Sequence, residues 1–276
     1  MTSTRLAWGI HLDTPDAGLL DRLRRIALAL PAHCVFVGHT AAAVHRLWCP
    51  RYDGEVQIAH TAHGRGRNMS RTTRVELVGS RRELPAADVM EIDGIRVTTP
   101  ARTWRDLAGR LRPVELVALG DSVLRAGVTS DDLAELIART RGRRGAVAAR
   151  ATLPLLDGRS RSRPESHVRF ELRVDGWPRF EVNTAVHDRN GGWLAEPDLS
   201  NEKYRIAIEY QGSGHVDLGR MRRDLTRGTC VAGEFWQILP VGPSEAFTHP
   251  DRLRLAVRAM LLTAGWTPSG QVRTAS

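Results

Sequence analysis

Two acidic residues stand on consecutive apolar segments in the last third of the chain. Asp198 ends the run Glu196-Pro197-Asp198, and Glu209 lies in the apolar stretch 204–210. If the two segments pair as neighbouring strands, opposed side chains of the ladder bring Asp198 close to Glu209. Two buried carboxylates raise each other's pKa, whereas a hard cation such as Mg²⁺ or Mn²⁺ relieves their repulsion. The pair therefore predicts a divalent-metal site.

A glutamate on a helix is a candidate third member of this site. Pro164-Glu165 suits the start of a helix, with Ser162 as its N-cap residue. Glu165, Val168 and Leu172 recur at helical spacing, so Glu165 begins the apolar face and points inward. Glu165 is expected to assist the metal directly or through water.

Two polar residues follow Glu209 in the chain. Gln211 leaves its strand on the same face as Glu209, because side chains two residues apart point the same way. His215 comes after a glycine-rich loop and titrates near neutral pH, so it could act as an acid or base. A loop histidine with no role is equally open.

Short apolar runs predict the elements that hold these residues. Segments 180–186 and 193–199 alternate apolar and polar residues around an Asn190-Gly191 turn, which favours a hairpin. The other expected elements are a strand over 204–210, a basic helix over 218–229, a strand over 235–241 and a closing helix over 251–262 with Leu253, Val257 and Met260 inward.

This order resembles the restriction-endonuclease-like superfamily with its PD…(D/E)xK motif. The resemblance rests on helical Glu165, Pro197-Asp198 and Glu209-Tyr210-Gln211, with His215 and Asp224 downstream. More narrowly, the chain resembles a group close to very-short-patch-repair endonucleases. The resemblance implies a mixed β-sheet flanked by helices, metal ligands at Asp198, Glu209 and Glu165, and catalytic roles for Gln211 and His215 beside the carboxylates.

One position departs from the motif. Gln211 replaces the superfamily's lysine, and an amide can orient a water but cannot supply a positive charge or take up a proton. Catalytic competence is therefore an open question. Lys203, in the loop before the Glu209 strand, is either a migrated catalytic lysine or a solvated loop residue, and the second is favoured.

The first half of the chain has its own resemblance. Strands over 89–92 and 95–98 form a predicted hairpin, followed by Thr99-Pro100 and a helix in which Trp104 and Leu107 face inward. Asp106 is placed to pair with Arg102 at i, i+4. This pattern is similar to the body of abortive-infection antitoxins of the AbiEi group. Residues 1–50 predict one long and one short helix instead of a winged helix, so operator binding and antitoxin activity are not carried over.

Histidine and cysteine residues near the N-terminus have no zinc-module spacing. His33, His39, His45 and Cys49 could be read as ligands, but polar contacts and core packing are favoured. Cys34, Cys49 and Cys230 lack the paired spacing of a disulfide framework.

Arginines dominate the segment that separates the two halves. Residues 139–163 carry a run of arginines against the single acid Asp157. Arginines beside a carboxylate site could hold phosphates that the site otherwise repels, whereas a solvated charge run is the competing interpretation. The candidate nucleic-acid-binding residues are Arg159, Arg161, Arg163, Arg222 and Arg223.

Bulk properties agree with a two-domain protein that meets a polyanion. The 276 residues carry a net charge of +9, and DNA is the first partner to consider. No long apolar run or signal-peptide pattern is present, so no membrane partner is indicated and the cytoplasm is the expected location. We expect an α/β (α+β) fold with an AbiEi-like domain over 1–158, a restriction-endonuclease-like domain over 159–266 and a disordered tail over 267–276.

The leading hypothesis is a Mg²⁺- or Mn²⁺-dependent DNA endonuclease, or a degenerate relative of one, in DNA repair or phage defence. Cutting both strands needs two active sites, so a homodimer is one arrangement to consider, although no interface is legible. The alternative is a non-catalytic DNA-binding or regulatory protein of a toxin–antitoxin or abortive-infection module.

Overall fold

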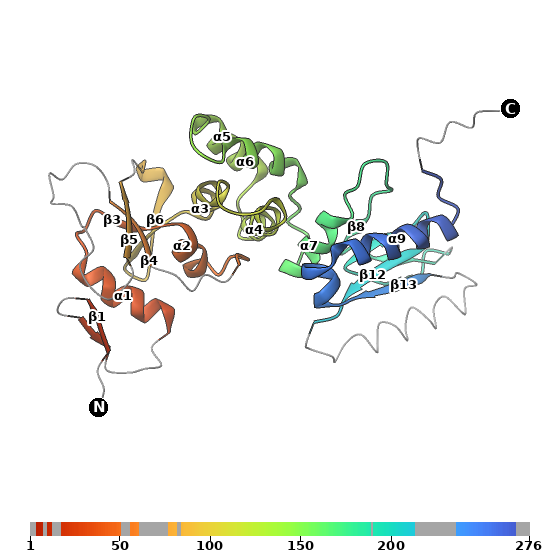
Figure 1. Ribbon diagram of the computed structural model, residues 1–276, viewed down its shortest axis with the longest axis horizontal. Coiled ribbons are helices and arrows are strands. Elements are labelled where there is room, and N and C mark those ends of the chain that lie inside the picture. Colours follow the sequence, from red (N-terminus) through yellow and green to blue (C-terminus); the bar gives the residue numbers. More distant parts are fainter. Residues whose placement is uncertain are drawn as a thin grey trace. The chain divides into compact units, whose positions relative to one another are not determined.

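The computed structural model divides the chain into two compact units, Met1–Leu156 and Asp157–Ser276, each with helices and mixed sheets (Figure 1). The expected two-domain α+β class is confirmed. The structure describes residues 4–7, 10–12, 18–50, 56–60, 77–81, 84–188, 190–212 and 236–268. Within these ranges, no helix combines the length and apolar character needed to cross a membrane.

The first unit contains a mixed sheet with strand order β5-β4-β3-β7-β6. Its strands are β3 (Cys34–Phe36), β4 (Val56–His60), β5 (Leu77–Arg81), β6 (Val89–Ile92) and β7 (Ile95–Thr98), and β1 (Thr4–Ala7) and β2 (Ile10–Leu12) form a separate pair. The β6–β7 hairpin has the predicted bounds. Its two-residue turn places both Asp93 and Gly94 at positive φ, which matches the twist of paired strands.

Helices α1 and α2 cover one face of this sheet. Leu23 and Ile26 on α1 pack with Phe36, Ile58 and Val97, so the amphipathic stripe of α1 finds its partner on the strands. The helices of this unit are α1 (Leu19–Ala29), α2 (Gly38–Val44), α3 (Pro100–Leu107), α4 (Pro113–Arg125), α5 (Ser130–Arg139) and α6 (Ala146–Thr152). The long and the short helix expected in residues 1–50 correspond to α1 and α2.

Helices α3 to α6 surround Trp104, which is fully buried. Its indole Nε1–H donates to the carbonyl of Leu116 at 3.0 Å, so the polar end of the ring is satisfied inside the core. The predicted inward positions of Trp104 and Leu107 are confirmed. Thr129 caps α5 through a capping box with Asp132, which fixes where that helix begins.

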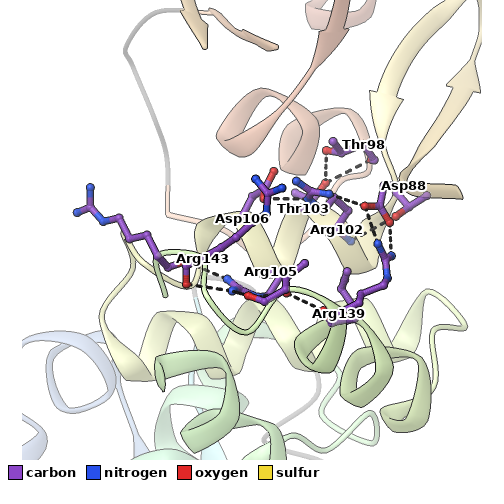
Figure 2. A network of polar contacts seen from close by, with 12 residues as sticks. Asp88, Thr98, Arg102, Thr103, Arg105, Asp106, Arg139 and Arg143 are labelled. Atoms are coloured by element: carbon purple, nitrogen blue, oxygen red, sulfur yellow. Dashed lines mark hydrogen bonds and ion pairs between the residues drawn. The ribbon is translucent and has the colours of Figure 1, made fainter. Parts of the chain in front are cut away.

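A buried ionic network joins the helices to the 3₁₀ turn before β6 (Figure 2). Asp88, 1% exposed, accepts hydrogen bonds from the guanidinium groups of Arg102 and Arg139. Arg102 also donates to Asp106 at 2.9 Å, as predicted from their i, i+4 spacing. Burial would raise the pKa of Asp88, but the hydrogen bonds from Arg139 and Arg102 outweigh it and hold the pKa below its ordinary value.

The Arg105 side chain forms hydrogen bonds with the turn that follows α5. Its guanidinium donates to Thr140 Oγ1 at 2.8 Å and to the carbonyls of Thr140, Arg143 and Arg144 (Figure 2). These carbonyls lie beyond the last turn of α5, where backbone acceptors need outside partners. The arginines of the Thr99–Ala108 motif therefore hold helices together, which explains its residue types without a catalytic role.

The second unit is built on a four-stranded sheet with order β13-β12-β11-β8. Its strands are β8 (Glu181–Val182), β11 (Leu199–Asn201), β12 (Ile206–Tyr210) and β13 (Gln237–Val241), and β9 (Val186–His187) pairs with β10 (Trp193–Ala195). Strands β12 and β13 are parallel, whereas β11 pairs antiparallel with β12 and with β8. The sheet is thus mixed, as expected.

Two helices cover one face of this sheet. Val168 on α7 (Arg163–Glu171) and Val257 on α9 (Pro250–Thr263) pack against Ile206 and Ile208. On α9, Leu253, Val257 and Leu261 are buried, whereas the predicted inward residue Met260 is only partly covered. The other face of the sheet packs against the β9–β10 pair.

The single strand predicted over 180–186 is wrong. Asn183 has φ of 44° and interrupts the extended backbone, so β8 and β9 belong to different sheets. The predicted strand over 193–199 is also divided, into β10 and β11. Pro197 lies between them and has no N–H to donate to a ladder. The predicted helix over 218–229 lies outside the described residues.

Candidate functional site

Asp198 and Glu209 meet at the ends of two paired strands. Leu199 lies opposite Ile208 in the β11–β12 ladder, so the preceding Asp198 falls beside Glu209. The Asp198 backbone N–H donates to Glu209 Oε1 at 3.3 Å, and the Tyr210 backbone N–H donates to Asp198 Oδ2 at 2.8 Å. The structure therefore brings together the two carboxylates that the sequence placed on neighbouring strands.

The two carboxyl groups disfavour each other's ionised form. Burial, followed by the charge of Asp198, raises the pKa of Glu209 to about 8. Burial also raises the pKa of Asp198 to about 6, against the lowering effect of the hydrogen bond from Tyr210. Among the described residues neither carboxylate forms an ion pair with an arginine. The charge of Arg161, which pairs with Glu196, lowers the pKa of Asp198 but does not outweigh burial. The two adjacent, buried acids thus have no ion-pair partner in the part of the chain that the structure describes.

Glu165 lies near this pair but is held by other groups. Ser162 caps α7 by accepting from the Glu165 backbone N–H at 3.4 Å, and the side chain is 7% exposed. Glu165 Oε2 accepts from the Arg161 backbone N–H at 2.7 Å and from Asn183 Nδ2 at 2.8 Å. Its charge raises the pKa of both Asp198 and Glu209, which places it within electrostatic reach of them.

The carboxylate pair fits a hard divalent cation. Within the described ranges, no group of three His, Cys, Asp or Glu side chains comes close enough to hold a metal ion. Mg²⁺, however, is commonly held by one or two carboxylates, with substrate phosphates and waters completing its coordination. Asp198 and Glu209 supply such a pair, and each uses one oxygen for a backbone hydrogen bond. The donor chemistry is therefore that of an open, substrate-completed site.

Of the predicted site residues that follow Glu209 in the chain, the structure describes Gln211 alone. Gln211 directly follows β12, and its backbone N–H donates to the carbonyl of Val241 at 2.7 Å, so the parallel β13 strand fixes its position. His215, Arg222, Arg223 and Asp224 lie outside the described residues.

The three arginines of the linker have partners in the second unit. Arg159 pairs with Asp157 at 2.9 Å and with Glu181 at 3.2 Å, and Arg161 pairs with Glu196. Arg163 lies over the ring of Phe247, 5.1 Å from its centroid. Arg159 and Arg161 are nevertheless more than half exposed, at 55% and 56%. Phosphate contacts by these two side chains would replace ion pairs that are exposed and weak.

Sequence reasoning missed Asn183 and Glu196. Asn183 contacts Glu165, and Glu196 orients Arg161, so both belong to the surroundings of the carboxylates. The signal for Asn183 was its residue type, because asparagine tolerates positive φ far better than most residues and marks breaks in strands. Glu196 stands next to Pro197 in the motif, but its pairing with Arg161 has no sequence signature.

Three of the four candidate ligands in the first unit make polar contacts, as the preferred interpretation predicts. Cys49 Sγ lies 3.3 Å from His39 Nδ1, and His45 Nε2 lies 2.7 Å from the carbonyl of Thr98. Burial lowers the pKa of both histidines, so both favour the neutral form. In the part of the chain that the structure describes, the side chains His33, His39, His45 and Cys49 do not come together as a metal site.

Exposed arginines flank a backbone contact between two turns of the first unit. Gly145 has φ of 84°, and a Cβ there would lie 2.4 Å from the Gly109 nitrogen, so the turns after α3 and before α6 touch backbone to backbone. This contact brings exposed arginines from both turns into one region, which we call the arginine surface. Its members are Arg110, Arg141, Arg143 and Arg144, whereas the exposed Arg112 of the turn after α3 pairs with Glu115.

Comparisons with known proteins find a family-model match in the first unit and two relatives along most of the chain. The family model for the AbiEi antitoxin C-terminal domain matches residues 32–155, which ends before the carboxylate pair. Uncharacterized proteins MT2308 and Rv2248 of two Mycobacterium tuberculosis strains are each 30% identical to the chain over 255 residues, covering 90% of this chain and 89% of theirs. No solved structure matches significantly. The chain therefore belongs to the family of these two mycobacterial proteins, with an AbiEi antitoxin C-terminal domain match in its first unit.

Proposed function

We propose that the chain is a DNA-binding regulatory component of a toxin–antitoxin or abortive-infection module. The observation that carries this proposal is the AbiEi antitoxin C-terminal domain match over residues 32–155. The net charge of +9 and the arginine surface support it, because exposed arginines neutralise DNA phosphates. A toxin protein is the partner that this family setting implies.

Binding of the full-length chain to duplex DNA at several salt concentrations tests this function. We expect log K to fall linearly with log salt, because phosphate contacts release counterions. Replacing Arg141, Arg143 and Arg144 together by serine should make that slope shallower. Arg112→Ser is the matched control, because Arg112 is 70% exposed but already paired with Glu115. Absence of salt-dependent binding, or an equal effect of the control, would contradict the proposal.

The second unit supports a second candidate function, metal-dependent cleavage of DNA. The specific observation is the buried Asp198–Glu209 pair, which forms no ion pair with an arginine among the described residues and has raised pKa values. Asp198 and Glu209 would hold Mg²⁺ or Mn²⁺, with the Tyr210 carbonyl as a further ligand. Such a bound ion supplies Lewis acidity and lowers the pKa of a coordinated water.

The chain's own residues would complete the reaction site. Glu165 would act through a water, since its Oε2 already accepts two hydrogen bonds. Gln211 would orient the attacking water through its amide, and His215 would exchange a proton near the leaving group. Cleavage of both strands would need two such sites, which a homodimer would provide.

Incubation of the purified chain with DNA and Mg²⁺ or Mn²⁺ separates the two candidates. Cleavage that disappears in Asp198→Ala and Glu209→Ala, with DNA affinity unchanged, would support the nuclease. Glu202→Ala is the control, because Glu202 is an exposed carboxylate of the same unit and its loss should keep cleavage. Binding without cleavage under either metal would leave the regulatory function.

A further inference from the structure

Asn183 connects three segments around the carboxylate pair. Its side-chain Nδ2 donates both to Glu165 Oε2 at 2.8 Å and to the carbonyl of Arg159 at 2.9 Å. Its backbone N–H donates to the carbonyl of Asp198 at 3.0 Å. One residue thus contacts the linker, the first turn of α7 and the segment that enters β11.

These contacts place unusual demands on the residue at position 183. The backbone has φ of 44°, which asparagine tolerates and most side chains do not. The amide must also donate two hydrogen bonds from one nitrogen, which aspartate cannot do and serine cannot match. Glycine would accept the backbone conformation but would remove both side-chain contacts. Asparagine is the residue that meets both requirements.

The Asn183 side chain helps to hold the Glu165 carboxylate in place. Glu165 receives one hydrogen bond from the Asn183 side chain and one from the Arg161 backbone, both on Oε2. With this oxygen occupied, the orientation of the carboxylate toward Asp198 and Glu209 is set by these two donors. Residues that orient the groups around a metal site affect metal affinity without touching the ion.

We propose that Asn183 is a positioning residue that fixes Glu165 relative to Asp198 and Glu209 and thereby sets the divalent-cation affinity of the site. The inference rests on the second candidate function above, in which the carboxylate pair holds the ion. Asn183 acts through Glu165 and through the Asp198 backbone, not by ligation. Its loss should weaken metal binding while the fold is retained.

Calorimetric titration of Mn²⁺ into the full-length protein tests this role. Asn183→Gly keeps the backbone conformation and removes the amide, so we expect binding to weaken about 10-fold. Asn201→Ala is the matched control: Asn201 Nδ2 donates to the Arg179 carbonyl and Oδ1 accepts from the Tyr204 N–H, without contact to a carboxylate. This control should bind Mn²⁺ as the wild type does. Thermal unfolding of each variant verifies that it is folded.

A double-mutant cycle with Glu165→Ala separates positioning from general destabilisation. If Asn183 acts through Glu165, the double variant binds Mn²⁺ no more weakly than Glu165→Ala alone, because the second change removes a partner already lost. Additive losses, an unchanged Asn183→Gly affinity, or an equal loss in Asn201→Ala would overturn the positioning role while leaving the metal site in place. A wild-type chain that binds no Mn²⁺ would overturn the metal site itself, and the positioning role with it.

Discussion

The Asp198 backbone N–H donates to Glu209 Oε1, so the strand that carries one acid directly contacts the side chain of the other. This hydrogen bond holds the two carboxyl groups together although burial and mutual repulsion oppose their ionisation. Burying such a pair without a cation is unfavourable for the fold.

Glu209→Gln should stabilise the protein when no divalent metal is present. The substitution keeps the shape and an acceptor oxygen for the Asp198 N–H but removes a carboxyl group that must take up a proton on folding at pH 7, because its folded pKa is about 8. We therefore expect the free energy of unfolding at pH 7 to rise by on the order of 1–3 kcal/mol. Urea unfolding in the presence of a chelator measures it. Glu202→Gln, at an exposed position of the same unit, should have little effect. A marked destabilisation by Glu209→Gln would show that the charge has a favourable partner.

The metal-free protein should lose stability as pH rises from about 4 to about 8. The pKa values of Asp198 and Glu209 are raised in the folded state to about 6 and about 8. The stability that the two protonated carboxyl groups allow is therefore fully present below their unfolded pKa values. It is lost as pH rises through their folded pKa values. Urea unfolding from pH 5 to pH 9 follows this change.

The affinity for Mn²⁺ should rise with pH, whereas the stability of the metal-free protein should fall. Metal ligands must be deprotonated, so affinity should rise between about pH 6 and pH 8 and protons should be released on binding. Calorimetry in buffers of different ionisation enthalpy counts these protons. Affinity that is flat across this range would contradict ligation by Asp198 and Glu209.

Asp88→Asn should strongly destabilise the first unit. The change leaves Arg102, 2% exposed, with less compensation for its buried charge, and loss of one partner of a buried ion pair costs about 3–5 kcal/mol. Chemical unfolding detects the loss. Asp93→Asn is the control, since Asp93 pairs with Arg24 at a position that is 55% exposed, and such surface pairs contribute about 0–1 kcal/mol.

The lowered pKa of Asp88 also gives that network a pH dependence. Its stabilising contribution is present above the unfolded pKa, near 3.8, and is lost as pH falls through the lower folded value. Acid unfolding of the wild type below about pH 4 should therefore include a component that Asp88→Asn lacks. An identical acid response in both proteins would contradict this assignment.

Elements with local signals were predictable from the sequence. The β6–β7 hairpin follows from its Asp93-Gly94 turn, and α5 follows from the Thr129 cap, because both signals act over a few residues. The approach of Asp198 to Glu209 also followed from the sequence, since pairing of adjacent strands sets it. The contacts that surround this pair did not, because they join residues far apart in the chain.

Contacts between residues far apart in the chain could not be predicted from the sequence. The Asn183–Glu165 hydrogen bond depends on how α7 meets the end of β8, which no periodicity encodes. The same holds for Arg139, which reads as part of a basic run yet pairs with the buried Asp88. A run of arginines in the sequence therefore contains structural and exposed members that only the fold separates.

Gln211→Lys tests whether the second unit retains the geometry of a nuclease site. The backbone of residue 211 is fixed by its hydrogen bond to Val241, so a lysine there would leave β12 from the same point, and side chains at 209 and 211 share one face of the strand. An ammonium group can stabilise charge on a phosphate, which an amide cannot. We expect the variant to nick supercoiled plasmid with Mg²⁺ faster than the wild type.

The matched control for this gain is Gln237→Lys. It adds the same charge to the neighbouring strand, but Gln237 pairs with Ile206 at the other end of the sheet, away from the carboxylates. If cleavage rises in both variants, added charge alone strengthens DNA binding. If it rises only in Gln211→Lys and disappears again when Glu209→Ala is added, the carboxylates and the residue at 211 act in one site. If neither variant nicks the plasmid faster than the wild type, the regulatory function is favoured. The carboxylate pair would then have no role in cleavage.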